Sequence, residues 1–213
     1  MQIVNNILVK IEDKDIVHNK VKIPNGVTGI GEYAFSNCKQ LKKINIPKSV
    51  TSIGNNAFFN CESLSTITIP ERVTRIGYMT FCNCHSLKSI IIPEEVIDIG
   101  ESAFSNCFSL KSINIPKGVT NIGDNAFSDC ESLSSISLPD SITNIGEGTF
   151  NGCSSLKLIA IPKGVTNIGD NAFSNCFSLK SIIMPEEVTN IGESAFYRCR
   201  LLESITIPNS VTN

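Results

Sequence analysis

The sequence is poor in the residues and patterns that mark several large functional classes. It has no tryptophan and only two histidines. It has no apolar stretch of about 18 residues, so a membrane-spanning helix is not expected. Its first residues, MQIVNNILVKIEDKDIV, lack a basic segment followed by an apolar run, and no signal peptide is visible there. Neither charge is in large excess, because 18 Lys and Arg oppose 20 Asp and Glu. A net charge of −2 argues against a dedicated nucleic-acid binder.

What the sequence does contain is a period of 23 residues. All nine prolines keep this step, as do eight glycines, eight phenylalanines and eight of the nine cysteines. The phenylalanines of the structural repeat are Phe35, Phe58, Phe81, Phe104, Phe127, Phe150, Phe173 and Phe196. The cysteines of the row are Cys38, Cys61, Cys84, Cys107, Cys130, Cys153, Cys176 and Cys199. A fixed period of this length predicts a solenoid.

The period divides the chain into three parts. Residues 1–23 end in VKIP and are predicted to form an N-terminal capping coil. Residues 24–207 hold eight 23-residue repeats, and residues 208–213 begin a further, truncated repeat. One coil of this length buries too little apolar surface to fold alone, so neighbouring coils must stack. We therefore expect one continuous repeat domain.

Each repeat follows the pattern P-x-x-V-T-x-I-G-x-x-A-F-x-x-C-x-x-L-x-x-I-x-I. Its last part alternates apolar and polar residues and stops at proline, which predicts a short strand with one buried face. Its middle, as in GDNAFSNCFSL, has the apolar spacing of one or two helical turns. The glycine before that segment is expected to take a backbone conformation that a side chain would disfavour. The stretch VTNIG suits a second short strand or a tight turn.

These positions together resemble the BspA-like leucine-rich repeat family. The segment IPKGVTNIGDNAFSNCFSLKSI (residues 161–182) agrees with the repeat of that family at every marked position, and the resemblance covers residues 24–213. It implies an α/β repeat solenoid, a right-handed superhelix with a parallel β-sheet on the concave face and short helical turns opposite. It also implies a cell-surface or secreted protein that binds other macromolecules, frequently as an adhesin.

The cysteine row is interpreted as part of the core. Its single position within the apolar pattern indicates small buried side chains with free thiols, although adjacent coils bring equivalent Cα atoms within disulfide range. Cys82 lies outside the row and is expected to be exposed. With Cys84 and His85 it forms a CNCH string, but three candidate ligands, one of them in the core, do not predict a metal site.

Signatures of catalysis are missing. There is no His-Glu-x-x-His, no nucleophile elbow and no phosphate-binding glycine loop. The acidic pairs Glu94–Glu95 and Glu186–Glu187 stand four repeats apart, roughly 19 Å in a regular stack, which is too far for two carboxylates to act on one bond. We predict no enzyme, no catalytic residue, no cofactor and no bound metal.

Binding of a protein or another macromolecule remains, and the outward positions of the strand are where we expect it. That row is mainly small and polar, so its apolar members are candidate partner-binding residues: Ile91, Leu158, Ala160 and Ile183. Phe108 and Phe177 mark a second candidate surface on the predicted helical side. Nucleic acid and membrane insertion are not expected.

Two alternatives stay open at this point. Near-duplicate units, such as PEEVIDIGESAF and PEEVTNIGESAF, suit a spacer or scaffold that displays another domain as well as they suit a binding module. A row of threonines, one in nearly every repeat, is also found in ice-binding solenoids. Threonine fits a strand-like backbone, so a structural role is the better interpretation of that row.

Overall fold

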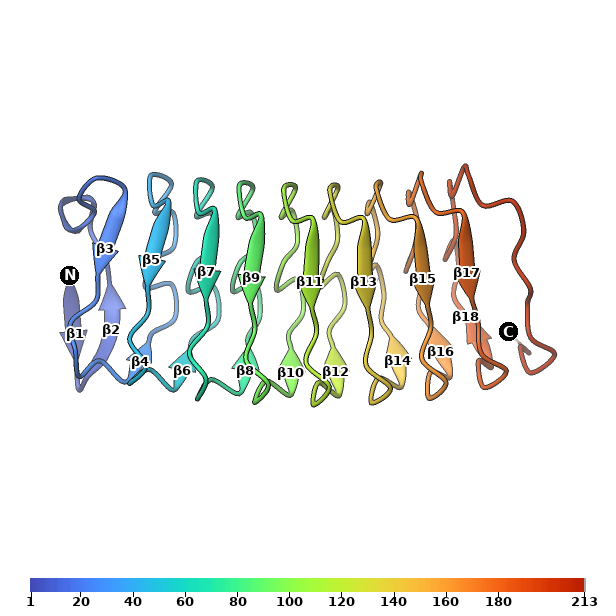
Figure 1. Cartoon of the computed structure of the whole chain (residues 1–213), viewed down its shortest axis with the longest axis horizontal. Coiled ribbons are helices and arrows are strands. Elements are labelled where there is room, and N and C mark those ends of the chain that lie inside the picture. Colours follow the sequence, from blue (N-terminus) through green and yellow to red (C-terminus); the bar gives the residue numbers. More distant parts are fainter. Residues whose placement is uncertain (213) are drawn as a thin grey trace.

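The computed structural model describes residues 1–212, which wind into a parallel β-solenoid. Figure 1 shows the coils stacked along one long axis, with the two ends of the chain at opposite ends of the stack. Most coils contribute one strand of three residues and one strand of two residues. Within residues 1–212 no helix is long and apolar enough to cross a membrane.

The three-residue strands follow the repeat leucine, where the sequence predicted them. They are β3 (Lys20–Lys22), β5 (Lys43–Asn45), β7 (Thr66–Thr68), β9 (Ser89–Ile91), β11 (Ser112–Asn114), β13 (Ser135–Ser137), β15 (Leu158–Ala160) and β17 (Ser181–Ile183). They pair in parallel and in register within the groups β3-β5-β7-β9, β11-β13 and β15-β17, so that Ile113 lies opposite Ile136. In most of them the central residue is buried and the two flanking residues are exposed, as expected for a strand with one face on the core.

The two-residue strands resolve the VTNIG stretch as strand and not as turn alone. They are β4 (Gly29–Ile30), β6 (Ser52–Ile53), β8 (Arg75–Ile76), β10 (Asp98–Ile99), β12 (Asn121–Ile122), β14 (Asn144–Ile145), β16 (Asn167–Ile168) and β18 (Asn190–Ile191). They too pair in parallel, in the groups β4-β6, β8-β10-β12 and β14-β16-β18. Their isoleucines point into the core, so each coil is closed by a strand on two sides.

The predicted short helical turns are wrong. In residues 1–212 the only helical element is the 3₁₀ helix η1 (Asp13–Asp15), in the first coil. The segments expected to be helical are runs of turns with a left-handed residue at every fourth position, such as Asn56 and Asn60 (φ 56° and 58°) or Asn171 and Asn175 (φ 54° and 60°). An α-helix requires negative φ throughout, and asparagine is among the few residues that tolerate this conformation.

The hydrogen bonds of these turns show what replaces the helix. The Ala57 N–H donates to the Gly54 carbonyl three residues back (3.3 Å), whereas the next N–H, of Phe58, donates to the Thr80 carbonyl of the following coil (2.9 Å). The same alternation recurs in the other coils. Half of the backbone donors of this segment therefore join coils together, which a helix, with all its bonds local, would not allow.

The repeat glycine is needed for close packing and not for an unusual φ. The conformation expected at this position is absent, because Gly54 and Gly169 are not among the residues with positive φ. A Cβ on Gly54 would lie 2.6 Å from the Glu32 nitrogen, and one on Gly169 would lie 2.7 Å from the Glu147 nitrogen. Each glycine thus lets the backbone of the preceding coil approach at a distance that no side chain permits.

The first coil is built differently from the rest. Strand β1 (Gln2–Val4) pairs antiparallel with β2 (Ile7–Lys10), and β2 continues the solenoid by pairing in parallel with β4. The amino group of Met1 forms an ion pair with Asp15 of η1. That residues 1–23 act as a cap stays a prediction, as do the repeat boundaries. The last residue of the predicted partial repeat 208–213 lies outside the described residues.

A column of phenylalanine rings runs through the core. Rings of neighbouring coils are stacked with centroids 4.9 to 5.7 Å apart and interplanar angles of 1° to 13°, from Phe35 to Phe196. All but the last of these rings are fully buried. Because each ring contacts the ring above and the ring below, removal of one ring weakens two interfaces between coils.

Phe127→Ala should therefore lower the free energy of unfolding by about 3–5 kcal/mol, since it leaves a cavity in the middle of the stack. Denaturant unfolding followed by circular dichroism measures the change. Phe177→Ala is the control, because Phe177 is exposed, and its cost should stay below about 1 kcal/mol. Equal midpoints for Phe127→Ala and the unmodified protein would contradict a structural role for the column.

Candidate functional site

The cysteine row holds the most reactive groups in the chain, its thiols. All nine cysteines are free, and those of the row lie in the core, except Cys199, which is half-buried. Each thiol of the row from Cys61 onward donates to the carbonyl of a phenylalanine in the preceding coil at 3.1–3.3 Å. The Phe58 carbonyl, for example, accepts from the Cys84 thiol and from the Cys61 N–H. The thiols thus connect coils.

Burial makes these thiols poor nucleophiles. Desolvation raises the pKa of every cysteine in the row, to about 11 for Cys38 and Cys199 near the two ends and further still for the central ones. A raised pKa removes the thiolate that reaction or metal binding requires. The row is therefore interpreted as a structural feature of the core.

Cys82 is buried, so the expectation that it is exposed is wrong. It is 5% exposed, and its pKa is raised by burial, which outweighs a hydrogen bond with Ser105 of the next coil. Ser128 and Ser174 occupy the same repeat position and are also buried. Ser36 and Ser105, at the same position, are only partly buried, so a small side chain alone does not decide whether this position is covered.

The structure separates the candidate ligands and the acidic pairs that the sequence singles out. Across residues 1–212 no group of three or more His, Cys, Asp or Glu side chains is placed to hold a metal ion. In the CNCH string, the His85 ring stacks on Phe108, with centroids 4.7 Å apart, while Cys84 lies in the core. Glu94, Glu95, Glu186 and Glu187 are exposed turn residues.

The outward residues of the three-residue strands lie on one side of the solenoid, which we call the strand face. Most of its side chains are Ser, Thr or Asn. Three large apolar side chains interrupt it, namely Ile91, Leu158 and Ile183, which are 64%, 52% and 59% exposed. Other repeats carry hydroxyl side chains at the same positions, so the fold does not require these apolar side chains. The three residues are therefore candidates for contact with a partner.

The structure brings only part of the predicted set together. Ala160 lies opposite Ile183 in the β15–β17 ladder, and Leu158 lies opposite Ser181, so Leu158 and Ile183 are diagonal neighbours. We call Leu158, Ala160 and Ile183 the apolar patch. Ile91 shares a row with Ala160 but is three coils away, about 14 Å, and does not belong to it.

Phe108 and Phe177 lie away from the strand face, in the turns that follow Cys107 and Cys176. Neither is free of contacts, since Phe108 stacks on His85 and the Arg200 guanidinium lies 5.0 Å from the centre of the Phe177 ring. Each ring pairs with the residue 23 positions away in the neighbouring coil. They are two separate sites three coils apart and not one surface.

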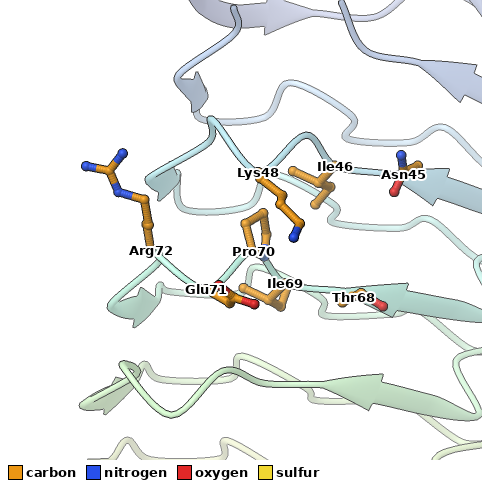
Figure 2. Close-up of a pocket in the computed structure, with 8 residues that line it drawn as sticks. All are labelled: Asn45, Ile46, Lys48, Thr68, Ile69, Pro70, Glu71 and Arg72. Carbon is orange, nitrogen blue, oxygen red and sulfur yellow. The ribbon is translucent and has the colours of Figure 1, made fainter. Parts of the chain in front are cut away.

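A groove that sequence reasoning missed lies beside β5 and β7. The segments that follow these strands enclose a groove of about 270 Å³, and the equivalent segments after β11 and β13, three coils further on, enclose another. In Figure 2 Lys48 reaches toward the next coil beside Pro70, and Arg72 points away. The residues that line the groove are Asn45, Ile46, Lys48, Thr68, Ile69, Pro70, Glu71 and Arg72.

Part of the threonine row makes a structural contact between coils. The hydroxyl groups of Thr51, Thr120 and Thr189 donate to backbone carbonyls of the preceding coil at 3.2–3.4 Å. A hydroxyl that satisfies a carbonyl between two coils stabilises the stack. This favours the structural interpretation of the row over ice binding.

Comparisons with known proteins agree with this geometry. The family described as BspA type leucine rich repeat region (6 copies) matches residues 14–134 and 120–213. A leucine-rich repeat protein from Bacteroides ovatus is 39% identical over the whole chain with a TM-score of 0.85, and the chain spans 54% of that protein's length. A leucine-rich repeat protein from T. pallidum is 32% identical over 84% of this chain and 86% of that one, with a TM-score of 0.76. No curated protein matches.

The burial pattern predicts the order in which the thiols react. Under native conditions N-ethylmaleimide should modify Cys199 first, because it is the one cysteine that is not fully buried, while Cys82 and the central thiols react slowly. Mass spectrometry after timed quenching measures the order, and denaturation should expose nine free thiols. Cys82 reacting first, or several intact disulfides, would contradict the burial that the structure shows.

Alkaline pH should destabilise the fold through the same groups. The unfolded thiol loses its proton above about pH 8.5, whereas a buried thiol with a raised pKa keeps it, so each such thiol lowers the free energy of unfolding by about 1.4 kcal/mol per pH unit. Denaturant unfolding at about pH 7.5 and about pH 9.5 in reductant measures this. Cys84→Ala removes one such group, and its stability relative to the unmodified protein should improve by about that amount per unit above pH 8.5. A constant difference would contradict burial of Cys84.

Proposed function

The chain belongs to the BspA-type leucine-rich repeat family, and from that premise we propose that it is a non-enzymatic module that binds another protein, in the manner of an adhesin, through its strand face. Membership of a leucine-rich repeat family supports a binding or scaffold role. The observation that carries the proposal is the apolar patch, which places Leu158 and Ile183 on adjacent coils within a face of hydroxyl and amide groups.

The patch has the composition of an interface centre. Protein interfaces consist of an apolar core that excludes water, surrounded by a polar rim, and a few central side chains contribute most of the affinity. Leu158 and Ile183 supply two exposed apolar side chains, and Ala160 between them leaves room for a side chain of the partner. Ser135, in the coil before that of Leu158, and Ser181, in the same coil as Ile183, supply the polar rim.

The solenoid holds this patch in place before a partner arrives. Leu158 and Ile183 lie on strands that are paired in register, and the isoleucines next to them, Ile159 and Ile182, are buried in the core. A rigid surface loses little conformational freedom on binding, so more of the contact energy is available as affinity. The outward side chains contribute little to the core, which allows them to change without loss of the fold.

Leu158→Asp with Ile183→Asp should weaken binding to a purified protein partner at least tenfold, about 1.4 kcal/mol, because two charges replace the apolar centre. The melting temperature should stay near that of the unmodified protein. The partner is obtained by affinity capture, identified by mass spectrometry and purified, and its Kd is then measured by calorimetry for each variant.

The matched control is Ile97→Asp, because Ile97 is an equally exposed isoleucine (55%) outside the strand face. Its effect on Kd should be less than twofold. Binding that survives the double change but is lost on replacing Phe108 and Phe177 would place the interface on the turn side. Failure to capture any protein would favour the spacer or scaffold role instead.

A further inference from the structure

The net charge of −2 conceals a strongly uneven distribution of lysine and acid. The uneven region consists of the strand face and the residue that precedes each three-residue strand, together with the equivalent positions of the last repeat, which include Glu203. Lysine occupies eight of these positions and an acid only one, Glu203, although acids slightly outnumber bases in the whole chain. The lysines are Lys20, Lys22, Lys42, Lys43, Lys88, Lys111, Lys157 and Lys180, and all are exposed.

Four of these residues form a line along the edge of the strand face, which we call the lysine row: Lys88, Lys111, Lys157 and Lys180. Their backbones are joined from coil to coil, since the Lys180 N–H donates to the Lys157 carbonyl (2.9 Å) and the Lys111 N–H to the Lys88 carbonyl (3.5 Å). Neighbouring lysines are therefore about 4.8 Å apart at the backbone, and Lys111 and Lys157 about 10 Å. The spacing of the cations is set by the fold.

A groove lies along this row. It has a volume of about 310 Å³ and is lined by Lys111, Lys157 and four serines, Ser132, Ser134, Ser155 and Ser178. The Ser134 hydroxyl donates to the Lys111 carbonyl at 3.4 Å. The hydroxyls of the other three serines form no hydrogen bond with another group of residues 1–212 and remain available to a ligand. A second groove, on the strand face beside it, is lined by the polar side chains of Ser112, Asn114, Ser135 and Ser137.

We propose that the lysine row and its serine groove bind an acidic polysaccharide that lies along the long axis of the solenoid. Carboxylate or sulfate groups would accept charge-assisted hydrogen bonds from the lysines, and sugar hydroxyls would pair with the free serine hydroxyls. Lysine and serine are both depleted at protein–protein interfaces, and the groove has no apolar or aromatic side chain to anchor a protein or to stack on a base. The polymer is expected on the strand side of the groove, because the exposed carboxylate of Glu131 on the turn side would repel its anionic groups.

The lysine row borders the apolar patch, since Lys157 directly precedes Leu158, but the two surfaces share no side chain and each can be changed without the other. Heparin fragments are the probe, with affinity measured by calorimetry in about 0.15 M salt. Lys111→Gln with Lys157→Gln should weaken binding at least tenfold and should reduce the slope of log K against log salt by about one to two, since two ion pairs are lost. The melting temperature should not change.

The matched control is Lys117→Gln with Lys163→Gln. These lysines are also exposed, also two coils apart and equal in charge, but lie in the turns after proline. Their loss should change heparin affinity less than twofold; an equal loss would mean non-specific charge attraction and would overturn the proposal. The triple change Ser132→Ala, Ser155→Ala and Ser178→Ala should weaken heparin binding but not binding of polyglutamate.

Two further outcomes would also overturn the proposal. One is the absence of heparin binding at that salt concentration. The other is tighter binding of polyglutamate or of a single-stranded oligonucleotide than of a heparin fragment with the same number of charges. In that case the row would be a site for an acidic protein or for nucleic acid. Dextran, which is neutral, should not bind, because it offers no partner for the lysines.

Discussion

Backbone hydrogen bonding between coils at one fixed spacing is the constraint on which the rest of this structure depends. It operates in the two strand ladders and in the turn segment, where every second N–H donates to the next coil. The side chains of the core follow from it. Phenylalanine rings stack because their backbones are held one coil apart, the cysteine thiols reach the carbonyls of the preceding coil, and glycine stands where two backbones approach too closely for a Cβ.

The same spacing turns the surface into rows, and the rows are where function is expected. A change at one outward position adds one side chain to a line whose neighbours are about 4.8 Å away, so a surface is assembled by substitution in successive repeats without any change of fold. The apolar patch arises in this way from three residues in two coils, and the lysine row from four residues in four coils. One face thus offers two surfaces of different chemistry, one suited to a protein and one to a polyanion.

Much of the candidate site was predictable because strand alternation fixes which residues point outward. Leu158, Ala160 and Ile183 were found from the sequence for this reason, and the structure adds that Ile91 stands apart from them. The lysine row was missed because net charge averages over the chain, whereas its lysines are 23 residues apart in sequence and adjacent only in space. The groove beside β5 and β7 was missed because its lining comes from two coils whose equivalent residues are 23 positions apart in the sequence.

The sequence by itself determined the period, the solenoid, the strands before each proline and the apolar positions of the core, because these depend on residue type and spacing within one repeat. Only the tertiary structure decided the rest. Apolar residues at steps of three fit a helical turn equally well, and the left-handed asparagines that prevent it, such as Asn56 and Asn60, are held by bonds to the next coil. Cys82 is buried for the same reason: in a stack, the neighbouring coil decides whether a side chain is covered, and a single repeat does not contain that neighbour.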